Sequence, residues 1–438
     1  MPETAPHSPA DLTTLLAGLP GYDADALSAK QAQQIIRQFI QPLHVPEKLA
    51  VRDALGRILA EDVVSGIDVP AYDNSAMDGY ALRSADLPDN APAVLSVTGI
   101  ALAGKAFQGI AERGECVHIM TGAVMPAGLD TVIPQELVQH AGDAAITILP
   151  GRIRPGANRR FKGEDLAMGK IALAKGKMLR AAELGLLASL GIAEVIVQRR
   201  LRVAFFSTGD ELRSVGETLD EGCVYDSNRY TLYGMLSRLG CDIIDMGVIP
   251  DDPVLLRAAF ENACLSADAV ITSGGVSVGM ADYTKPMMAE MGDVAFWGIN
   301  MRPGRPMAFG KVNAGAGSAR KSAYLFGLPG NPVAVMISFY FFVRDALLHM
   351  AGASPAPLPL VGVRSAAAIR KRPGRTEYQR GILSTAADGN LEVRITGSQG
   401  SGILRSMTQA NCILVLGDAQ ADVAAGDLVQ VVLFDGLL

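Results

Sequence analysis

Apolar runs and helical patterns alternate along the second half of the chain, from residue 201 onward. Short runs typical of buried strands end at Ser207, Ile249 and Thr272. Each run is followed by turn residues and then by apolar positions three or four apart, which indicates a helix. This alternation predicts a doubly wound α/β domain with a mostly parallel sheet.

The rest of the chain has a different pattern. Residues 29–42 and 51–61 have apolar positions at helical spacing, and a helix followed by a strand is predicted over 180–198. Residues 94–148 alternate short β-type runs with glycine and proline, which indicates a β-rich region. A further β-pattern follows the proline-rich segment at 355, so a separate C-terminal β domain is expected. The first 27 residues are expected to form a flexible extension.

Composition and charge narrow the class of protein. The chain has 438 residues, of which 49% are hydrophobic and 19% charged, and its net charge is −6. These values are typical of a multidomain globular protein. The acidic balance argues against nucleic-acid binding. The sequence contains neither a signal-peptide pattern nor a run of 18 apolar residues, so no membrane segment is expected.

The five cysteines are scattered without a CxxC pair, and the five histidines are isolated. Scattered thiols are typical of reduced cysteines, so a cytoplasmic location is expected rather than a disulfide framework or a zinc site. Isolated histidines disfavour both a histidine-ligated metal and a Ser-His-Asp triad. Metal chemistry would instead use carboxylates and a hard cation such as Mg²⁺.

The stretch VITSGGVSVGMADYTK, residues 270–285, joins a predicted buried strand to a predicted helix. Small residues let backbone N–H groups approach a ligand, and the positive end of the following helix favours anions. The stretch therefore predicts an anion site, built from Ser273, Gly274, Gly275, Ser277 and Gly279. Neither standard nucleotide fingerprint is complete, because Met280 stands where a Walker loop has lysine. A glycine-rich turn that binds nothing is the alternative.

Three further turns follow predicted strands: TGDE (208–211), DD (251–252) and GLPGN (327–331). The carboxyl ends of parallel strands meet at one edge of a sheet, where ligands of open α/β sheets bind. Carboxylates gathered there could hold Mg²⁺ beside a phosphate-type ligand; they are Asp210, Glu211, Asp226, Asp251, Asp252 and Asp282. Helix capping is the alternative for Asp252 and Asp282, which open predicted helices.

Six motifs occur in a fixed order: DNSAMDGYA (73–81), IMTGA (119–123), FSTGDEL (206–212), ITSGGVSVGMADYTK (271–285), GLPGNPV (327–333) and TGSQGSG (396–402). With these motifs the chain resembles the molybdopterin molybdenumtransferase (MoeA) family, which includes the E domain of gephyrin. The resemblance covers nearly the whole chain from about residue 28.

The resemblance implies a transferase of molybdenum cofactor biosynthesis. Such an enzyme inserts molybdate into adenylylated molybdopterin and releases AMP, with Mg²⁺ assisting. It also implies a homodimer with a composite active site, formed by the α/β domain of one subunit and the loop-bearing β domain of the other. Expected partners are the adenylyltransferase that supplies the substrate and the molybdoenzymes that receive the cofactor.

The resemblance also implies domain boundaries. A small discontinuous α+β domain is expected at 28–66 and 170–199, and a β-rich insertion domain at 67–169. The α/β domain is expected at 200–353, and a β-barrel-like domain at 354–438.

The family's functional positions match this chain in residue type. The residues with an implied catalytic role are Asp78, Thr121, Asp165, Glu211, Asp251 and Asp282, of which Glu211, Asp251 and Asp282 are the implied metal ligands. The resemblance also implies functional roles for Arg380 and Ser401, which are expected to bind substrate. The predicted loops at the sheet edge add Ser273, Gly274, Gly275, Ser277, Gly279, Gly330 and Asn331, and Arg302 and Arg305 are candidates for binding the anionic groups of the ligand. One departure concerns Gly298, Arg302 and Arg305, which stand where some relatives have three lysines.

Two other functions are compatible with parts of this pattern. The adenylyltransferase shares the α/β domain and the GGVSVG-type loop but lacks the flanking domains and DNSAMDGYA, so the sequence disfavours it. A non-catalytic scaffold, as gephyrin partly is, would not need the retained carboxylates. The sequence therefore favours the enzyme over both alternatives.

Overall fold

The computed structural model describes residues 11–140, 144–275, 281–317, 320–355 and 357–436, with only the backbone of 281–285. The chain forms two compact units. Unit 1 comprises residues 1–47, 56–60 and 196–438, and unit 2 comprises residues 48–55 and 61–195. Each unit is described by itself below.

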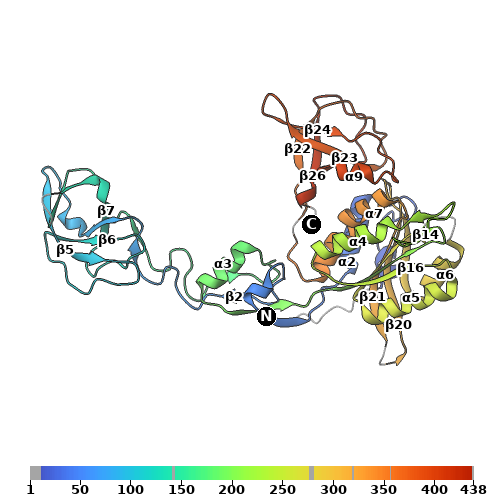
Figure 1. Cartoon of the computed structure of the whole chain (residues 1–438), viewed down its shortest axis with the longest axis horizontal. Coiled ribbons are helices and arrows are strands. Elements are labelled where there is room, and N and C mark those ends of the chain that lie inside the picture. Colours follow the sequence, from blue (N-terminus) through green and yellow to red (C-terminus); the bar gives the residue numbers. More distant parts are fainter. Residues whose placement is uncertain (1–10, 141–143, 276–280, 318–319, 356, 437–438) are drawn as a thin grey trace. The chain divides into compact units, whose positions relative to one another are not determined.

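Unit 1 contains a six-stranded sheet with helices on both faces (Figure 1). Its strand order is β16 (Asp242–Ile249), β13 (Arg202–Thr208), β17 (Ala269–Ser273), β21 (Lys321–Leu328), β20 (Pro306–Ala314) and β18 (Gly292–Gly298). The first four strands are parallel and the last two join antiparallel. The α/β fold predicted from the alternating pattern is confirmed.

The side chains of β13 alternate between two cores, as the period of a strand requires. Val203 and Phe205 join the core that contains α4 (Ser227–Arg238), whereas Ala204 and Phe206 join the core that contains α5 (Pro253–Ser266). The second core also receives three methionines of α6 (Ala281–Met291). Burial on both faces explains why these strands are almost wholly apolar.

A continuous helix, residues Pro332–Met350, runs through the first core. It consists of α7 (Pro332–Ser338), a π-helical turn (Phe339–Val343) and α8 (Arg344–Met350). By length and composition this helix could cross a membrane, but 72% of its apolar window is buried inside the structure. Its apolar character therefore has a sufficient explanation in core packing.

The C-terminal part of unit 1 is a closed five-stranded barrel. Its strands follow the order β23 (Thr376–Thr385), β24 (Leu391–Ile395), β22 (Val361–Ser365), β26 (Leu428–Leu433) and β25 (Cys412–Leu416), and β25 pairs again with β23. A short strand of the α/β region, β19 (Met301–Arg302), pairs in parallel with β23. The barrel and the α/β sheet are thus joined beside Arg302.

Unit 2 is built on an antiparallel-rich sheet, as the β-rich pattern of 94–148 predicts. Its order is β7 (Thr131–Pro134), β4 (Gly79–Leu82), β6 (Glu115–Ile119), β5 (Ala93–Ala101), β9 (Ala145–Ile148) and β8 (Val138–His140). The same unit holds α3 (Ala181–Ser189) and two small ladders, β2 (Val63–Val64) with β11 (Ile171–Leu173) and β3 (Asn74–Ser75) with β10 (Arg159–Arg160).

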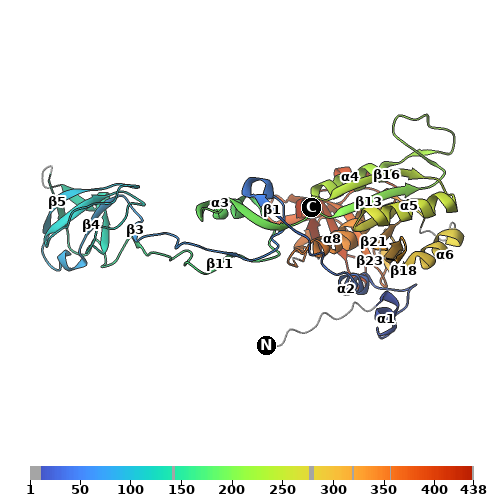
Figure 2. The same ribbon diagram turned by 90° about the horizontal axis from the view of Figure 1, so that it is seen from below.

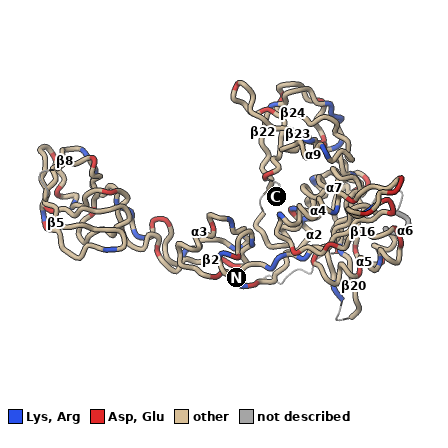
Figure 3. The backbone as a smooth tube through the Cα atoms, in the orientation of Figure 1, with Lys and Arg blue, Asp and Glu red and all other residues tan. Residues whose placement is uncertain are grey.

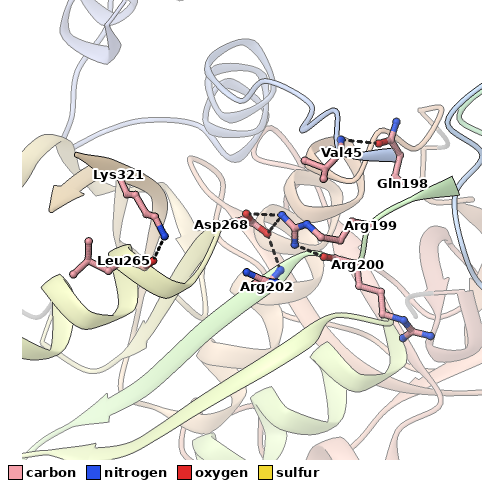
Figure 4. Close-up of polar contacts among 8 residues, drawn as sticks. All are labelled: Val45, Gln198, Arg199, Arg200, Arg202, Leu265, Asp268 and Lys321. Carbon is pink, nitrogen blue, oxygen red and sulfur yellow. Dashed lines mark hydrogen bonds and ion pairs between the residues drawn. The ribbon is translucent and has the colours of Figure 1, made fainter. Parts of the chain in front are cut away.

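The segment that leads into β13 is held by a polar network around Asp268 (Figure 4). Arg199 Nη2 lies 3.0 and 3.1 Å from the two Asp268 carboxylate oxygens, and the backbone N–H of Arg202 donates to the same group at 2.8 Å. Arg199 N–H also donates to Val45 O at 2.8 Å. These contacts fix the start of β13 and the segment before it.

Three expectations for the N-terminal region differ from the structure. The predicted helix over 51–61 is only a short 3₁₀ helix, Val51–Ala54. Helix α2 (Ala29–Phe39) was expected in the small discontinuous domain, but Ile35, Ile36 and Phe39 pack into the core of the α/β region. Residues 11–27 were expected to be a flexible extension, but they include helix α1 (Leu12–Ala17), and Leu12 is fully buried.

Candidate functional site

The glycine-rich turn after β17 has a backbone that only glycine tolerates. Gly274 has φ +90°, and a Cβ placed on it would lie 2.7 Å from Thr208 O. A side chain would therefore clash with the end of the neighbouring strand β13. Of the predicted anion-site residues, Ser273, Gly274 and Gly275 lie here, whereas Ser277 and Gly279 fall outside the described residues.

Asn228, in the first turn of α4, connects two of the predicted loops. Its Nδ2 donates to Ser273 Oγ at 2.7 Å and to Gly330 O at 2.6 Å. Asn228 is buried, and its Oδ1 has no hydrogen-bond partner among the described residues. Asn228 is not among the residues predicted from the sequence, although the polar triplet Asp226-Ser227-Asn228 stands at the start of a helix.

Several other buried polar atoms at this edge lack a partner within the described part of the chain. They are Ser207 Oγ, Thr208 Oγ1, Asp226 Oδ2, Asp251 Oδ1 and Thr272 Oγ1. Leaving a buried polar group unsatisfied costs about 1–3 kcal/mol. Several such atoms at the carboxyl ends of adjacent strands are therefore typical of a surface that a polar ligand completes.

The carboxylates that follow β13 (Asp210 and Glu211) lie near the carboxylate that follows β16 (Asp251). The backbone N–H of Asp251 donates to Asp210 Oδ1 at 3.1 Å. Burial raises the pKa of Asp251, and the negative charges of Asp210 and Glu211 raise it further. A carboxylate in this position would gain from a bound cation.

The described residues contain no group of three or more metal-type side chains close enough to hold an ion. The side chain of Asp282, the third predicted ligand, lies outside that description, so the predicted trio with Glu211 and Asp251 stays a prediction. Asp252 accepts hydrogen bonds from Val254 N and Leu255 N at 2.8 and 2.9 Å, which confirms its capping alternative.

A group of arginines lies where the barrel meets the α/β region. Arg380 on β23 is fully buried, and its Nε donates to Ser406 Oγ at 3.0 Å. Burial, and secondly the positive charge of Arg302, lower the pKa of Arg380 to about 10, so it stays charged at neutral pH. Neither arginine takes part in an ion pair with a carboxylate of the described residues. Two cations held close without a counter-charge favour an anionic ligand.

The loop that carries Ser401 joins this arginine group to the predicted anion loops. Arg380 Nη2 donates to Gly400 O at 3.0 Å, and Ser401 O accepts from Val333 N, also at 3.0 Å. Asn331 is the N-cap residue of α7, but its side chain makes no capping bond. Gly330, Asn331, Arg302, Arg380 and Ser401 therefore belong to one junction. We call Arg302, Arg305, Arg380 and Ser401 the arginine pocket.

Arg305 differs from the other arginines of this group. It is exposed, and its Nη2 donates to the backbone carbonyl of Asp25 at 3.0 Å.

Charged residues are unevenly distributed over unit 1. Lysine and arginine lie along the barrel near β23 and α9 (Arg405–Gln409), and carboxylates lie around β14 (Leu212–Arg213) (Figure 3).

Unit 2 holds the remaining predicted residues. Asp78 Oδ1 accepts from the backbone N–H of Thr121 at 2.6 Å and from Thr121 Oγ1 at 2.7 Å. These two hydrogen bonds lower the pKa of Asp78. Asp165 lies in an exposed loop, where its N–H donates to Val69 O at 3.1 Å. The structure therefore brings Asp78 and Thr121 together in an ionised, hydrogen-bonded pair.

Three family models match the chain in order. They describe the MoeA N-terminal region (domain I and II) over residues 27–191, a probable molybdopterin binding domain over 204–349, and the MoeA C-terminal region (domain IV) over 362–434. The boundaries of the last two agree with the α/β region and the barrel described above.

Curated relatives and solved structures are similar over most of the chain. A molybdopterin molybdenumtransferase of Haemophilus influenzae is 42% identical over 90% of this chain and 95% of its own length. Gephyrin of Dictyostelium discoideum is 33% identical over 88% of this chain and 59% of its own length. A MoeA protein structure from Pyrococcus horikoshii has a TM-score of 0.78 at 29% identity, covering 93% of this chain and 100% of that one. With three ordered domains and this identity over nearly its whole length, the chain belongs to the MoeA family of molybdopterin molybdenumtransferases.

Proposed function

We propose that the chain inserts molybdate into adenylylated molybdopterin and releases AMP. The observation that carries this proposal is the buried Arg380 guanidinium beside Arg302, with no carboxylate partner for either among the described residues. Such a pair can attract an oxyanion, because the exposed Arg302 guanidinium can donate several N–H groups to it. The N–H groups of Arg380 donate within the chain, so its buried charge contributes to the positive potential rather than to direct contacts.

The loops at the sheet edge are suited to the other substrate. Gly274 and Gly275 keep the first two positions after β17 free of side chains, and Asn228 connects Ser273 to Gly330. The side-chain-free backbone at these glycines, and the buried hydroxyls that have no partner among the described residues, can accommodate phosphate and pterin groups. The backbone hydrogen bond from Val333, which follows Gly330 and Asn331, to Ser401 O would place the pterin loops beside the arginine pocket.

The carboxylates after β13 and β16 fit a hard cation, because Asp251 Oδ1 is buried without a partner in the described part of the chain and lies near the negative charges of Asp210 and Glu211. Mg²⁺ prefers one or two carboxylates, waters and ligand oxygens. Glu211 and Asp251, with Asp282, would hold it. Bound there, Mg²⁺ would neutralise negative charge on the phosphates of the adenylylated substrate.

Asp78 and Thr121 are proposed to act on the same substrate from unit 2, together with Asp165. A carboxylate kept ionised by two hydrogen bonds can orient a donor group of a ligand. We further infer that the chain works as a homodimer in which unit 2 of one subunit completes the site of the other.

The direct test measures AMP released by the purified protein from adenylylated molybdopterin, with and without molybdate and Mg²⁺. AMP release that requires molybdate, together with incorporation of molybdenum into the pterin, is the expected result. Formation of adenylylated molybdopterin from molybdopterin and ATP would instead identify an adenylyltransferase. Neither reaction, despite binding of the pterin, would indicate a scaffold.

A further inference from the structure

Residues 11–28, here called the N-terminal strap, lie along β18, the edge strand of the α/β sheet (Figure 2). Helix α1 begins where the backbone N–H groups of Leu12 and Thr13 donate to the Asp293 carboxylate, and Thr13 Oγ1 donates to it at 3.0 Å. Leu12 and Leu27, near the two ends of the strap, are buried in the core of the α/β region. The strap is therefore an integral part of this sheet edge.

Four consecutive strap carbonyls, those of residues 24–27, accept hydrogen bonds from the segment 298–305. The donor and acceptor pairs are Gly298 N to Ala24 O (2.7 Å), Arg305 Nη2 to Asp25 O (3.0 Å), Asn300 Nδ2 to Ala26 O (3.0 Å) and Asn300 N to Leu27 O (2.7 Å). Every one of these donors lies within or beside the turn that carries Arg302. The strap thus contacts the arginine pocket directly through its backbone.

The end of β18 is shaped to receive the strap. A Cβ on Gly298 would lie 3.0 Å from Asp25 O and 3.2 Å from Asp25 Cα. The neighbouring Trp297 donates its Nε1–H to Tyr22 Oη at 3.1 Å. The close passage of the strap therefore explains why a residue without a side chain stands at 298.

The turn at 299–306 is held from two sides. On the barrel side, Thr376 N donates to Asn300 O at 3.0 Å, and β19 pairs with β23. On the other side the strap binds Asn300 through both its backbone and its side chain. These contacts on both sides hold the backbone from which the exposed Arg302 side chain extends.

We propose that the N-terminal strap is a positioning element of the arginine pocket: by holding the turn 299–306 it sets the affinity of Arg302 and Arg305 for molybdate. This inference rests on the proposed function, because it takes the pocket to be the molybdate site. None of the strap carbonyls needs to touch the oxyanion for this effect.

The test uses Gly298→Val in the full chain, where the new side chain pushes against Asp25. Molybdate affinity is measured by calorimetry, and the emission of Trp297, the single tryptophan, reports whether the strap is seated. We expect the emission to shift and affinity to fall about three- to tenfold. Gly185→Val is the matched control, since nothing lies within 4 Å of a Cβ at Gly185.

Two further variants make the test specific. Asn300→Ala removes the bond to Ala26 O without adding bulk and should weaken molybdate binding in the same direction. Tyr22→Phe changes the surroundings of Trp297 but leaves the four carbonyl contacts, so it should alter emission without altering affinity. In an Arg302→Ala background, Gly298→Val should have little further effect, because the strap acts through that turn.

The outcomes distinguish a failure of the positioning role of the strap from a failure of the proposed molybdate site. If Arg302→Ala lowers molybdate affinity but Gly298→Val and Asn300→Ala leave it unchanged while Trp297 emission shifts, the strap has no positioning role. If Arg302→Ala itself leaves affinity unchanged, the arginine pocket is not the molybdate site, and the proposals for both pocket and strap fail together.

Discussion

At the scale of single residues, Arg302 is the side chain whose removal should affect molybdate most directly. It is exposed, close enough to lower the pKa of Arg380, and without an acidic partner among the described residues. A charge-assisted contact contributes roughly 1.5–3 kcal/mol, so Arg302→Ala should weaken molybdate binding about tenfold or more. Arg302→Lys should restore only part of the affinity, because a point charge replaces a planar fork.

Calorimetric titration with molybdate measures this effect. Arg364→Ala is the matched control, since Arg364 is an exposed arginine of the barrel that lies near Asp388 instead. Equal affinities for wild type, Arg302→Ala and Arg305→Ala would mean that these arginines are ordinary surface charges.

Asp251 should make stability depend on pH in a predictable direction. Its folded-state pKa is raised, so the folded protein holds a proton that the unfolded chain has lost once pH exceeds the ordinary value of about 3.9. Stability from this group is therefore present at low pH and is lost as pH rises through the folded-state pKa. Asp251→Asn removes that loss and should melt at a higher temperature than wild type at neutral pH without Mg²⁺.

Melting curves from pH 4 to 8 with a chelator measure the difference, which should shrink toward the acid end. Added Mg²⁺ should raise the melting temperature of wild type more than that of the variant, whose catalytic activity should be low. A difference in melting temperature that stays constant across this pH range would contradict the assignment.

At the scale of elements, the turn between β17 and α6 should tolerate no side chain at Gly274. Its φ of +90° and the 2.7 Å approach to Thr208 O strain any substitution. Gly274→Ala should lower the free energy of unfolding by about 1–3 kcal/mol and weaken binding of adenylylated molybdopterin. Denaturant unfolding and a pterin-binding titration measure the two effects. Gly397→Ala, at a position with open space and no positive φ, should change neither quantity. Wild-type values for Gly274→Ala would refute the proposed role of this turn in binding the pterin substrate.

At the scale of the whole molecule, the proposed composite site can be tested by mixing two inactive chains. Asp78→Ala damages unit 2 and Asp282→Ala damages unit 1, so a mixed dimer would contain one intact site if the site is shared between subunits. Random mixing should then restore about a quarter of wild-type activity. Differently tagged chains allow heterodimers to be counted. Heterodimers that form but show no molybdate-dependent AMP release would place each site within one subunit.

The local pattern of the chain was enough to predict most elements and the edge at which they converge. Strands such as Ala269–Ser273 are recognisable because burial on both faces requires an uninterrupted apolar run. The turns that follow parallel strands must lie at one edge, so the approach of Asp251 to Asp210 was foreseeable without coordinates. These features depend on periodicity and chain direction, which are local properties of the sequence.

Only the tertiary structure decided which partner each residue has. Asp251 and Asp252 are neighbours, yet Asp251 has a buried oxygen with no partner among the residues that the structure describes, whereas Asp252 caps a helix. Asn228 joins loops that are 45 and 102 residues away in sequence, and the N-terminal strap reaches a turn some 280 residues away. An apolar period shows that a face is buried but not what covers it, so the packing of α2 and the strap could not be foreseen. The sequence alone determined the elements, their order and the sheet edge at which the loops meet. Long-range packing decided the arginine pocket, because its charges, carbonyls and buried surfaces come from segments that only the folded chain brings into contact.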